Sequence, residues 1–210
     1  MQVIIFGATG MVGKELVNQS LYKGYRVKAY GRNVFTAGLP EKQELELVQG
    51  ALFDEKQVLE AIRGCDAVLS SLGGGVGGAD FTRSLGMKNI VAQMQQAGVH
   101  RIMAVGGKGT LLVNDDELLM EQPDYPQQFL PVSHEHLKAY EILKASNLQW
   151  TVVCPPDIIN AAATGEFITA ANYPPSPDTN RITAGDLALF MLGELTNNEY
   201  VQQRVGISAR

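Results

Sequence analysis

The chain has 210 residues, a length that suits one domain, so we expect residues 1–210 to form a single unit. With 17 Lys and Arg against 22 Asp and Glu, its formal net charge is -5, which offers no basic surface to the phosphates of DNA or RNA and no basic helix to a membrane surface. Because no basic leader or long apolar run opens the chain, we expect a cytoplasmic protein that binds neither nucleic acid nor a membrane.

Apolar runs and amphipathic stretches alternate along the chain. Residues 3–6 form a short continuous apolar run, which is typical of a strand buried on both faces. In chain order the pattern predicts a strand at 3–6, a helix at 12–23, strands at 25–30 and 45–49, a helix at 55–63, a strand at 67–72, a helix at 81–97, a strand at 101–105, a helix at 133–146, a strand at 149–153, a helix at 184–195 and a last strand at 204–208.

Residues with known capping preferences mark several of these helix ends. Gly24 stands where a left-handed C-terminal cap belongs. Asp54 and Asp80 are candidate N-terminal caps, and Thr183 with Asp186 resembles a capping box for the last helix. These signals support the helix assignments independently of the apolar period.

The alternation of strands and helices implies a parallel sheet with right-handed crossovers and helices on both faces. We therefore predict a single Rossmann-type, doubly wound α/β sheet of order 3-2-1-4-5-6, with 204–208 as a candidate seventh strand. Ligands bind such sheets at the carboxyl ends of the strands. The glycine-rich stretch 73–78 follows a strand end on that side, and 109–131 with 157–182 is expected to form a small substrate-side region.

A glycine loop, GATGMVG at residues 7–13, separates the first strand from the first helix. Gly7 and Gly10 let the backbone turn sharply and approach a pyrophosphate, and Gly13 lets the helix pack closely against the strand. The free amides and the positive dipole end of the helix favour phosphate groups. Because the loop lies between an apolar strand and an amphipathic helix, it predicts a dinucleotide site.

The end of the second strand suggests which dinucleotide is bound. Sites for NAD usually place an acidic residue here, roughly twenty residues after the last glycine of the loop, to bind the ribose 2′-hydroxyl. The segment 30–33 (YGRN) has no acid and offers Arg32 instead, whose guanidinium attracts a 2′-phosphate. We predict that NADP(H) is preferred over NAD(H); the alternative is that Arg32 is a solvated surface residue.

The loop and several other segments resemble the atypical short-chain dehydrogenases of the NmrA-like group, whose loop reads GATGxxG, and most closely the flavin reductase/biliverdin-IXβ reductase type. The further matching segments are 50–52 (GAL), 65–68 (CDAV), 89–91 (NIV), 144–148 (KASNL), 155–158 (PPDI) and 181–188 (RITAGDLA). They cover nearly the whole chain. The GATGxxG loop is specific for the superfamily, and the Pro-Pro segment is moderately specific for the subgroup.

The resemblance implies a set of cofactor contacts at the strand ends. The residues expected to bind the cofactor are Gly7, Thr9, Gly10, Met11, Val12, Arg32, Leu52, Leu72, Gly73, Gly106, Gly107, Pro155 and Ile158. In the reductases of this type, hydride passes from the nicotinamide to a flat acceptor stacked on it. The resemblance therefore implies an NADP(H)-dependent oxidoreductase that transfers hydride to a planar small molecule such as a flavin or a quinone.

The chain departs from the reductases at three points near the expected site. Gly106-Gly107-Lys108 stands where they carry Thr-Ser, Asp157 stands where biliverdin reductase has a His, and Ala51 replaces an Asp that contacts adenine. Asp157 and Lys108 are thus candidate catalytic residues, one to orient a substrate or relay a proton and one to neutralise an anionic acceptor. The alternatives are a turn cap for Asp157 and simple solvent exposure for Lys108.

Carbonyl-reducing members of the superfamily use Tyr-x-x-x-Lys, in which the Lys lowers the pKa of the Tyr. Tyr140 and Lys144 have that spacing but lie toward the wrong end of their helix, so we interpret them as a surface pair. His134, four residues before Lys138, is a third catalytic candidate, with a solvent-facing histidine as the alternative. His134 and His136 point to different helix faces, so no metal site is expected.

The same residues are compatible with a second function. The missing Ser and the lack of a convincing Tyr–Lys pair are also compatible with a non-catalytic redox sensor, like the NmrA regulators, that binds the dinucleotide and reports its oxidation state to a protein partner. A large difference in affinity between oxidised and reduced cofactor would distinguish the sensor from the reductase.

Overall fold

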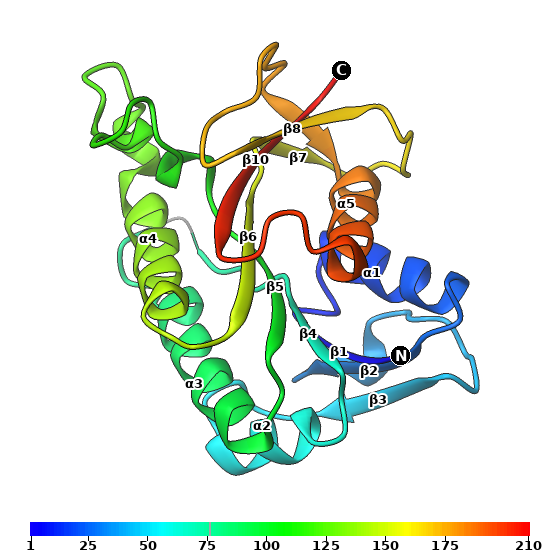
Figure 1. Ribbon diagram of the computed structural model, residues 1–210. Helices are drawn as coiled ribbons and strands as arrows, with labels where there is room; N and C mark the ends of the chain where they lie inside the picture. The colour runs from blue at the N-terminus through cyan, green and yellow to red at the C-terminus, as the bar shows by residue number, and fades with distance from the viewer. Residues whose placement is uncertain (76) are drawn as a thin grey trace.

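A computed structural model describes residues 1–75 and 77–210 of the chain (Figure 1). Its centre is an eight-stranded sheet of order β3-β2-β1-β4-β5-β6-β10-β8. The strands of this sheet are β1 (Gln2–Phe6), β2 (Arg26–Gly31), β3 (Leu45–Gln49), β4 (Ala67–Ser70), β5 (Arg101–Val105), β6 (Gln149–Cys154), β8 (Phe167–Ala171) and β10 (Gln203–Ala209). All neighbours pair in parallel except β8, which runs antiparallel to β10.

The predicted fold class and the order 3-2-1-4-5-6 are confirmed, and β10 is the predicted seventh strand. Five α-helices are assigned within the described residues: α1 (Met11–Tyr22), α2 (Glu55–Ile62), α3 (Thr82–Ala97), α4 (Leu130–Lys144) and α5 (Ala184–Asn197). None of the helices in the described ranges combines the length and the apolarity needed to cross a bilayer.

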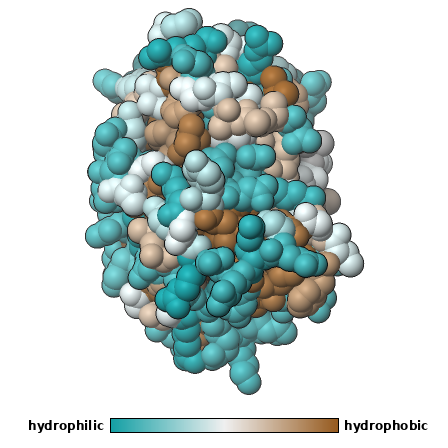
Figure 2. Space-filling model, turned by 90° about the vertical axis from the view of Figure 1, so that its right-hand side faces the viewer, coloured by the Kyte–Doolittle hydropathy of each residue, from teal (hydrophilic) through white to brown (hydrophobic). Residues whose placement is uncertain are grey.

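Helices cover both faces of the sheet because alternate residues of its central strands point to opposite sides. Ile4 and Phe6 of β1 pack into the core under α2, α3 and α4. Val3 and Ile5 of the same strand pack into the core under α1 and α5. Figure 1 shows α2, α3 and α4 on one side of the sheet and α1 with α5 on the other. The face that carries α1 and α5 is mostly hydrophilic, with apolar patches near its centre (Figure 2).

The predicted caps are present in most cases. Gly24 has a left-handed backbone, with φ +77°, after α1. Asp54 accepts a hydrogen bond from the Gln57 amide at 2.9 Å, and Thr183 accepts one from the Asp186 amide at 2.9 Å. Asp80 was predicted as the cap of α3 but lies one residue before the N-cap, Phe81; its carboxylate still accepts from the Thr82 amide.

Three short strands have no counterpart in the sequence prediction. Besides β8, these are β7 (Asp157–Ile159) and β9 (Arg181–Thr183), which pair in parallel as a separate two-stranded sheet. The predicted start of α4 was also wrong, because the helix begins three residues earlier, at Leu130, with Pro131 in its first turn. This difference brings the first turn of α4 to the ligand side of the sheet.

Candidate functional site

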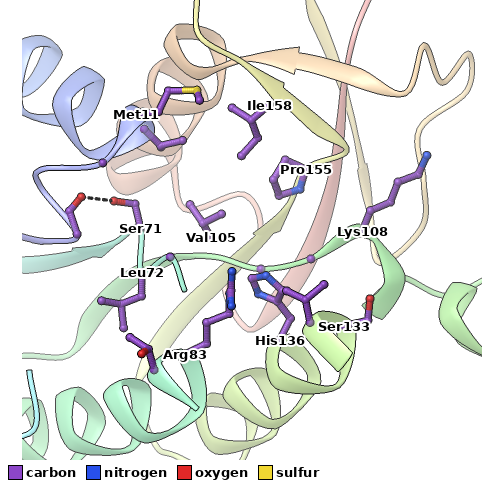
Figure 3. Close-up of a pocket in the computed structure, with 18 of the residues that line it drawn as sticks. Met11, Ser71, Leu72, Arg83, Val105, Lys108, Ser133, His136, Pro155 and Ile158 are labelled. Atoms are coloured by element: carbon purple, nitrogen blue, oxygen red, sulfur yellow. Dashed lines mark hydrogen bonds between the residues drawn. The ribbon is translucent and has the colours of Figure 1, made fainter. Parts of the chain in front are cut away.

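The glycine loop takes the shape that its sequence predicts. Gly7 has φ +81°, in the region that favours glycine, and a Cβ there would collide with the backbone carbonyl of Ser71. The Ser71 hydroxyl donates to the Gly7 carbonyl at 3.3 Å, which ties the loop to the end of β4 (Figure 3). A Cβ at Gly13 would overlap the Gly7 carbonyl, so the first turn of α1 packs directly on the loop.

The N-terminus of α1 is suited to an anion. Gly10 is its N-cap in an extended conformation, no side chain caps it, and its first turn carries no acidic residue. The first amides of a helix have no partner within the helix, and its dipole is positive at this end. The residues present therefore fit a pyrophosphate, which would accept hydrogen bonds from these amides.

A cavity of about 1030 Å³ runs from this loop across the carboxyl ends of β1, β4, β5 and β6. Its size is at the upper end of the range for small-molecule sites, as an extended dinucleotide requires. The cavity is lined by all the residues expected to contact the cofactor: Gly7, Thr9, Gly10, Met11, Val12, Arg32, Leu52, Leu72, Gly73, Gly106, Gly107, Pro155 and Ile158. Val76, in the predicted loop 73–78, lies outside the described residues.

One end of the cavity is formed by β2 and the segment after β3. Arg32 is exposed there, and no acidic side chain lines this end within the described part of the chain. Tyr30 forms the floor and donates its hydroxyl hydrogen to the Ala51 carbonyl at 2.9 Å. Burial, with Asp54 adding, raises the pKa of Tyr30 to about 12, so this hydroxyl remains protonated. Phe53 is 58% exposed at the rim, where it offers a flat apolar surface.

The other end of the cavity contains a neutral imidazole. His136 of α4 lies against the backbone at the end of β5, so that a Cβ at Gly107 would approach the imidazole ring to 2.7 Å. Burial, helped by the positive charge of Arg83, lowers the pKa of His136 to about 3. Arg83 lies beside it (Figure 3) and donates to the carbonyls of Gly74 and Gly75. His136 is therefore neutral at physiological pH and carries no proton that it can readily give up.

The three predicted catalytic candidates take different positions. Lys108 lines the cavity, but its ammonium group lies 2.7 Å from Asp178 Oδ2 and 2.7 Å from Asn180 Oδ1. Asp157 lines the cavity at an exposed position in β7. His134 is exposed and is not among the residues that line the cavity, so the geometry gives it no part in the site.

The Tyr140 and Lys144 pair also lies away from the cavity. The Tyr140 ring packs edge-on against Trp150 at 5.6 Å and under the Arg204 guanidinium at 4.5 Å. The Lys144 ammonium lies 5.9 Å from the same ring. Both residues lie outside the cavity, as predicted, but the interpretation as a surface pair was wrong for Tyr140, which packs against the core between α4 and β6, whereas Lys144 is exposed.

Sequence reasoning did not find three polar residues that line the end of the cavity near β5 and α4. They are His136, Ser133 and Tyr125, and the last two share a hydrogen bond of 2.7 Å between their hydroxyl oxygens. His136 precedes the buried Ala139 by three residues and the buried Leu143 by seven. That helical spacing is a signal that could have placed His136, and not His134, on the inner face of α4.

The arrangement agrees with what is found among known proteins. A family model described as NAD(P)H-binding matches residues 7–198. The chain belongs to this NAD(P)H-binding family. The match runs from the first glycine of the loop to the end of α5, so it includes the glycine loop and the ends of β2, β4, β5 and β6.

Relatives of this NAD(P)H-binding protein share its length and fold. The uncharacterised protein YwnB of Bacillus subtilis is 25% identical, with 97% of this chain and 96% of that protein covered. A solved structure from Burkholderia pseudomallei, provisionally described as an exported protein, is 27% identical with a TM-score of 0.85 and 99% of both chains covered. A Streptococcus pneumoniae structure, provisionally named an NADH-flavin reductase, has a TM-score of 0.83 over all of both chains at 24% identity, a likeness that concerns the fold.

Proposed function

We propose that the protein is an NADP(H)-dependent reductase that transfers hydride to a planar small molecule. One observation supports this proposal most strongly: a continuous cavity joins the glycine loop to an apolar compartment. That compartment is walled by Leu119, Phe129, Val132, Pro155 and Ile158. When bound, the cofactor supplies the hydride, and the chain supplies orientation and a pocket from which water is largely excluded.

The residues at each end have distinct parts in this proposal. The amides of Met11 and Val12 bind the pyrophosphate, and Arg32 pairs with the 2′-phosphate of NADP(H). Pro155 and Ile158 restrict the nicotinamide to one orientation, with the compartment on its reactive side. The five walls named above are apolar, so they suit a flat conjugated ring, and the polar side chains at the same end are available to its substituents. The name of the Streptococcus pneumoniae structure supports this class of acceptor.

The test follows the absorbance of NADPH at 340 nm in the presence of pure protein and FMN, riboflavin or menadione, with NADH in parallel. We expect turnover with at least one acceptor, and a higher kcat/KM with NADPH than with NADH. Tight cofactor binding without turnover of any acceptor would contradict the reductase.

Gly10→Asp is the matched control for cofactor dependence. Asp is a favourable N-cap residue, so the variant should fold at least as well as the wild type. Its carboxylate would lie where the pyrophosphate binds, so we expect both cofactor binding and turnover to be lost together. Turnover that survives in Gly10→Asp would show that the reaction does not use this site.

A redox sensor with a protein partner is the second candidate. It is favoured by one observation: Tyr140 and Lys144, which have the Tyr-x-x-x-Lys spacing of the carbonyl reductases, lie outside the cavity. A sensor would bind NADP⁺ and NADPH with very different affinities and would reduce none of the acceptors. Calorimetry with both forms separates the two functions, because equal affinities together with turnover exclude the sensor.

A further inference from the structure

Tyr125 and Ser133 form an isolated pair of hydroxyl groups at the acceptor end of the cavity. Tyr125 lies between two short turns of the 109–131 segment, and Ser133 lies in the first turn of α4. Both line the cavity, and their oxygens are 2.7 Å apart. Ser133 is 3% exposed, which makes it the more deeply buried of the two.

The pair has an unused hydrogen-bond donor. Two hydroxyl groups carry two O–H donors, and one hydrogen bond between them uses one donor. Among the described residues neither hydroxyl has a second partner. The pair is partly buried and lines the cavity, so its free donor can be satisfied by a ligand or by water that enters the cavity. The free donor is therefore available to an atom bound in the cavity.

The backbone makes room for this pair. Gly109 is buried, and a Cβ there would lie 2.5 Å from the Tyr125 hydroxyl oxygen and 2.7 Å from Ser133 Oγ. Gly109 follows the end of β5 by four residues, in the same turn as Gly107, against which His136 packs. The hydroxyl pair thus lies beside the part of the cavity where the nicotinamide end of the cofactor is expected.

Other polar groups at this end are poorly placed to give a proton. His136 is neutral because its pKa is about 3, and the Lys108 ammonium is bonded to Asp178 and Asn180. Asp157 is exposed at the edge of the site. A phenol with a supporting hydroxyl is, by contrast, a group that can act as a general acid.

We propose that Tyr125 protonates the oxygen of the acceptor during hydride transfer, that Ser133 positions its phenol, and that the acceptor is therefore a conjugated carbonyl compound such as a quinone or an enone. This inference rests on the proposed reductase function and narrows its substrate class. Tyr125 is the catalytic residue, because it contacts the acceptor oxygen, and Ser133 is a positioning residue.

For such an acceptor, the hydride and the proton come from different groups. A carbon of the acceptor gains a hydride from the reduced nicotinamide, and the π electrons of the carbonyl move onto its oxygen. That oxygen takes the proton of the Tyr125 hydroxyl, and Ser133 donates a hydrogen bond to the resulting phenolate. Water then returns a proton to Tyr125. The acceptor is reduced by two electrons, and NADPH is oxidised to NADP⁺.

The first test compares single-turnover hydride transfer from NADPH to menadione and to FMN in Tyr125→Phe, Ser133→Ala and Ser133→Thr. We expect Tyr125→Phe to lower the menadione rate by about 10²-fold and to leave the FMN rate nearly unchanged, since a reduced flavin can leave as an anion. Ser133→Ala should lower the menadione rate less, and Ser133→Thr, which keeps a hydroxyl, should restore it. Tyr173→Phe is the control, because it removes a hydroxyl bonded to Asp115 outside the cavity.

The second test needs no turnover. The pKa of 4-nitrophenol, followed at 400 nm in protein saturated with NADP⁺, reports whether hydroxyl donors stabilise an oxyanion in the cavity. We expect the wild type and Tyr173→Phe to lower the pKa of the bound dye and Tyr125→Phe to abolish that shift. Gly109→Ala keeps both hydroxyls but displaces them, and it should also lose the shift.

The outcomes separate this inference from the proposed function. The inference is overturned if the wild type reduces menadione no faster than Tyr125→Phe. It is also overturned if the pKa of bound 4-nitrophenol does not shift, or shifts equally, in the wild type and Tyr125→Phe. A wild type that reduces FMN but not menadione overturns the proposed acceptor class. If the wild type reduces neither acceptor, the reductase function fails, and the dye shift alone decides whether the pair binds an oxyanion.

Discussion

Arg32 and His136 lie at opposite ends of the same cavity and contribute to it in different ways. Arg32 is exposed and can change partners at little cost, so its contribution is a charge offered to a ligand. His136 is packed against Gly107 and stays neutral because burial and Arg83 disfavour its charged form. We therefore propose that Arg32 influences the choice of cofactor and expect His136 to influence the stability of the site.

Arg32→Ala should lower the affinity for NADPH by about tenfold and leave the affinity for NADH nearly unchanged. A charge-assisted hydrogen bond to a phosphate is worth roughly 1.5–3 kcal/mol, and solvent screening reduces this at an exposed position. Arg26→Ala is the control, since Arg26 is also exposed on β2 but does not line the cavity. Calorimetric titration with both cofactors checks this, and an equal loss for the two would show that Arg32 does not recognise the 2′-phosphate.

The low pKa of His136 makes the stability of the fold depend on pH. Between about pH 6.5 and about 3, the unfolded chain protonates this histidine and the folded chain does not, so acid favours unfolding. His136→Gln should therefore lose less unfolding free energy than the wild type between pH 7 and 4.5, by roughly 2 kcal/mol. His134→Gln, an exposed neighbour on the same helix, is the control. Urea unfolding at the two pH values measures the difference, and parallel losses in all three proteins would contradict it.

At the scale of single residues, the sequence predicts those whose role follows from a local motif. The contacts in the glycine loop and Arg32 follow from short-range spacing, because the loop, the helix and the strand end lie within one βαβ unit. Tyr125 has no such signal, since it lies in a segment without regular periodicity. Its proximity to Ser133 depends on how the 109–131 segment folds over α4, which no local pattern encodes.

Among the elements, α1 is positioned by a close approach at one glycine. Its first turn packs so closely on the loop after β1 that a Cβ at Gly13 would overlap the Gly7 carbonyl. This close packing leaves no room for a side chain at position 13. Gly193, in the interior of α5, has room for a side chain instead. A Cβ there would meet no atom of the described residues within 4 Å beyond the neighbouring backbone of its own helix.

Gly13→Ala should destabilise the fold by roughly 2 kcal/mol or more, because relieving the overlap requires α1 to move away from the loop. Gly193→Ala should instead be neutral or stabilise the fold by up to about 1 kcal/mol, since Ala favours a helix and has room here. Thermal unfolding of both variants and the wild type tests this pair. Similar melting temperatures for the two variants would argue against the close approach of α1.

The sequence predicts the parallel strands of the central sheet well because they are apolar runs, as in β1, or alternating stretches, as in β3, between clear turn signals. β7, β8 and β9 escape prediction for a physical reason. They are short, and β8 is half-buried along its whole length, so neither a continuous apolar run nor strict alternation marks it. The start of α4 was missed although Pro131 carried the signal, since Pro is favoured in the first turn of a helix.

At the scale of the whole molecule, the central sheet and α5 are linked by a buried ion pair. Arg101 of β5 donates to Glu194 of α5 at 3.2 Å and to the Thr151 hydroxyl of β6 at 2.9 Å. The second carboxylate oxygen of Glu194 accepts from the Glu199 amide at 3.0 Å. Two strands, a helix and the turn after it are thereby held together by one buried cluster.

Arg101→Met should cost roughly 3–5 kcal/mol of unfolding free energy, because it leaves the Glu194 charge buried without its partner. Arg101→Met with Glu194→Gln should recover part of this loss, since Gln is neutral. Arg63→Met is the control, since the Arg63–Glu60 pair is exposed and should contribute little. Urea unfolding gives all three values. A cost for Arg101→Met no larger than that for Arg63→Met would rule out a structural role for the pair.

The two ends of the cavity are formed by different kinds of structural element. Its cofactor end consists of short turns that leave hydrogen-bonded strands, whereas its acceptor end draws on the 109–131 segment and on the turn containing Asn180, both outside the central sheet. Neither segment contributes a strand to that sheet. A protein of this architecture can therefore acquire a different substrate specificity while the cofactor end of its cavity keeps the same shape.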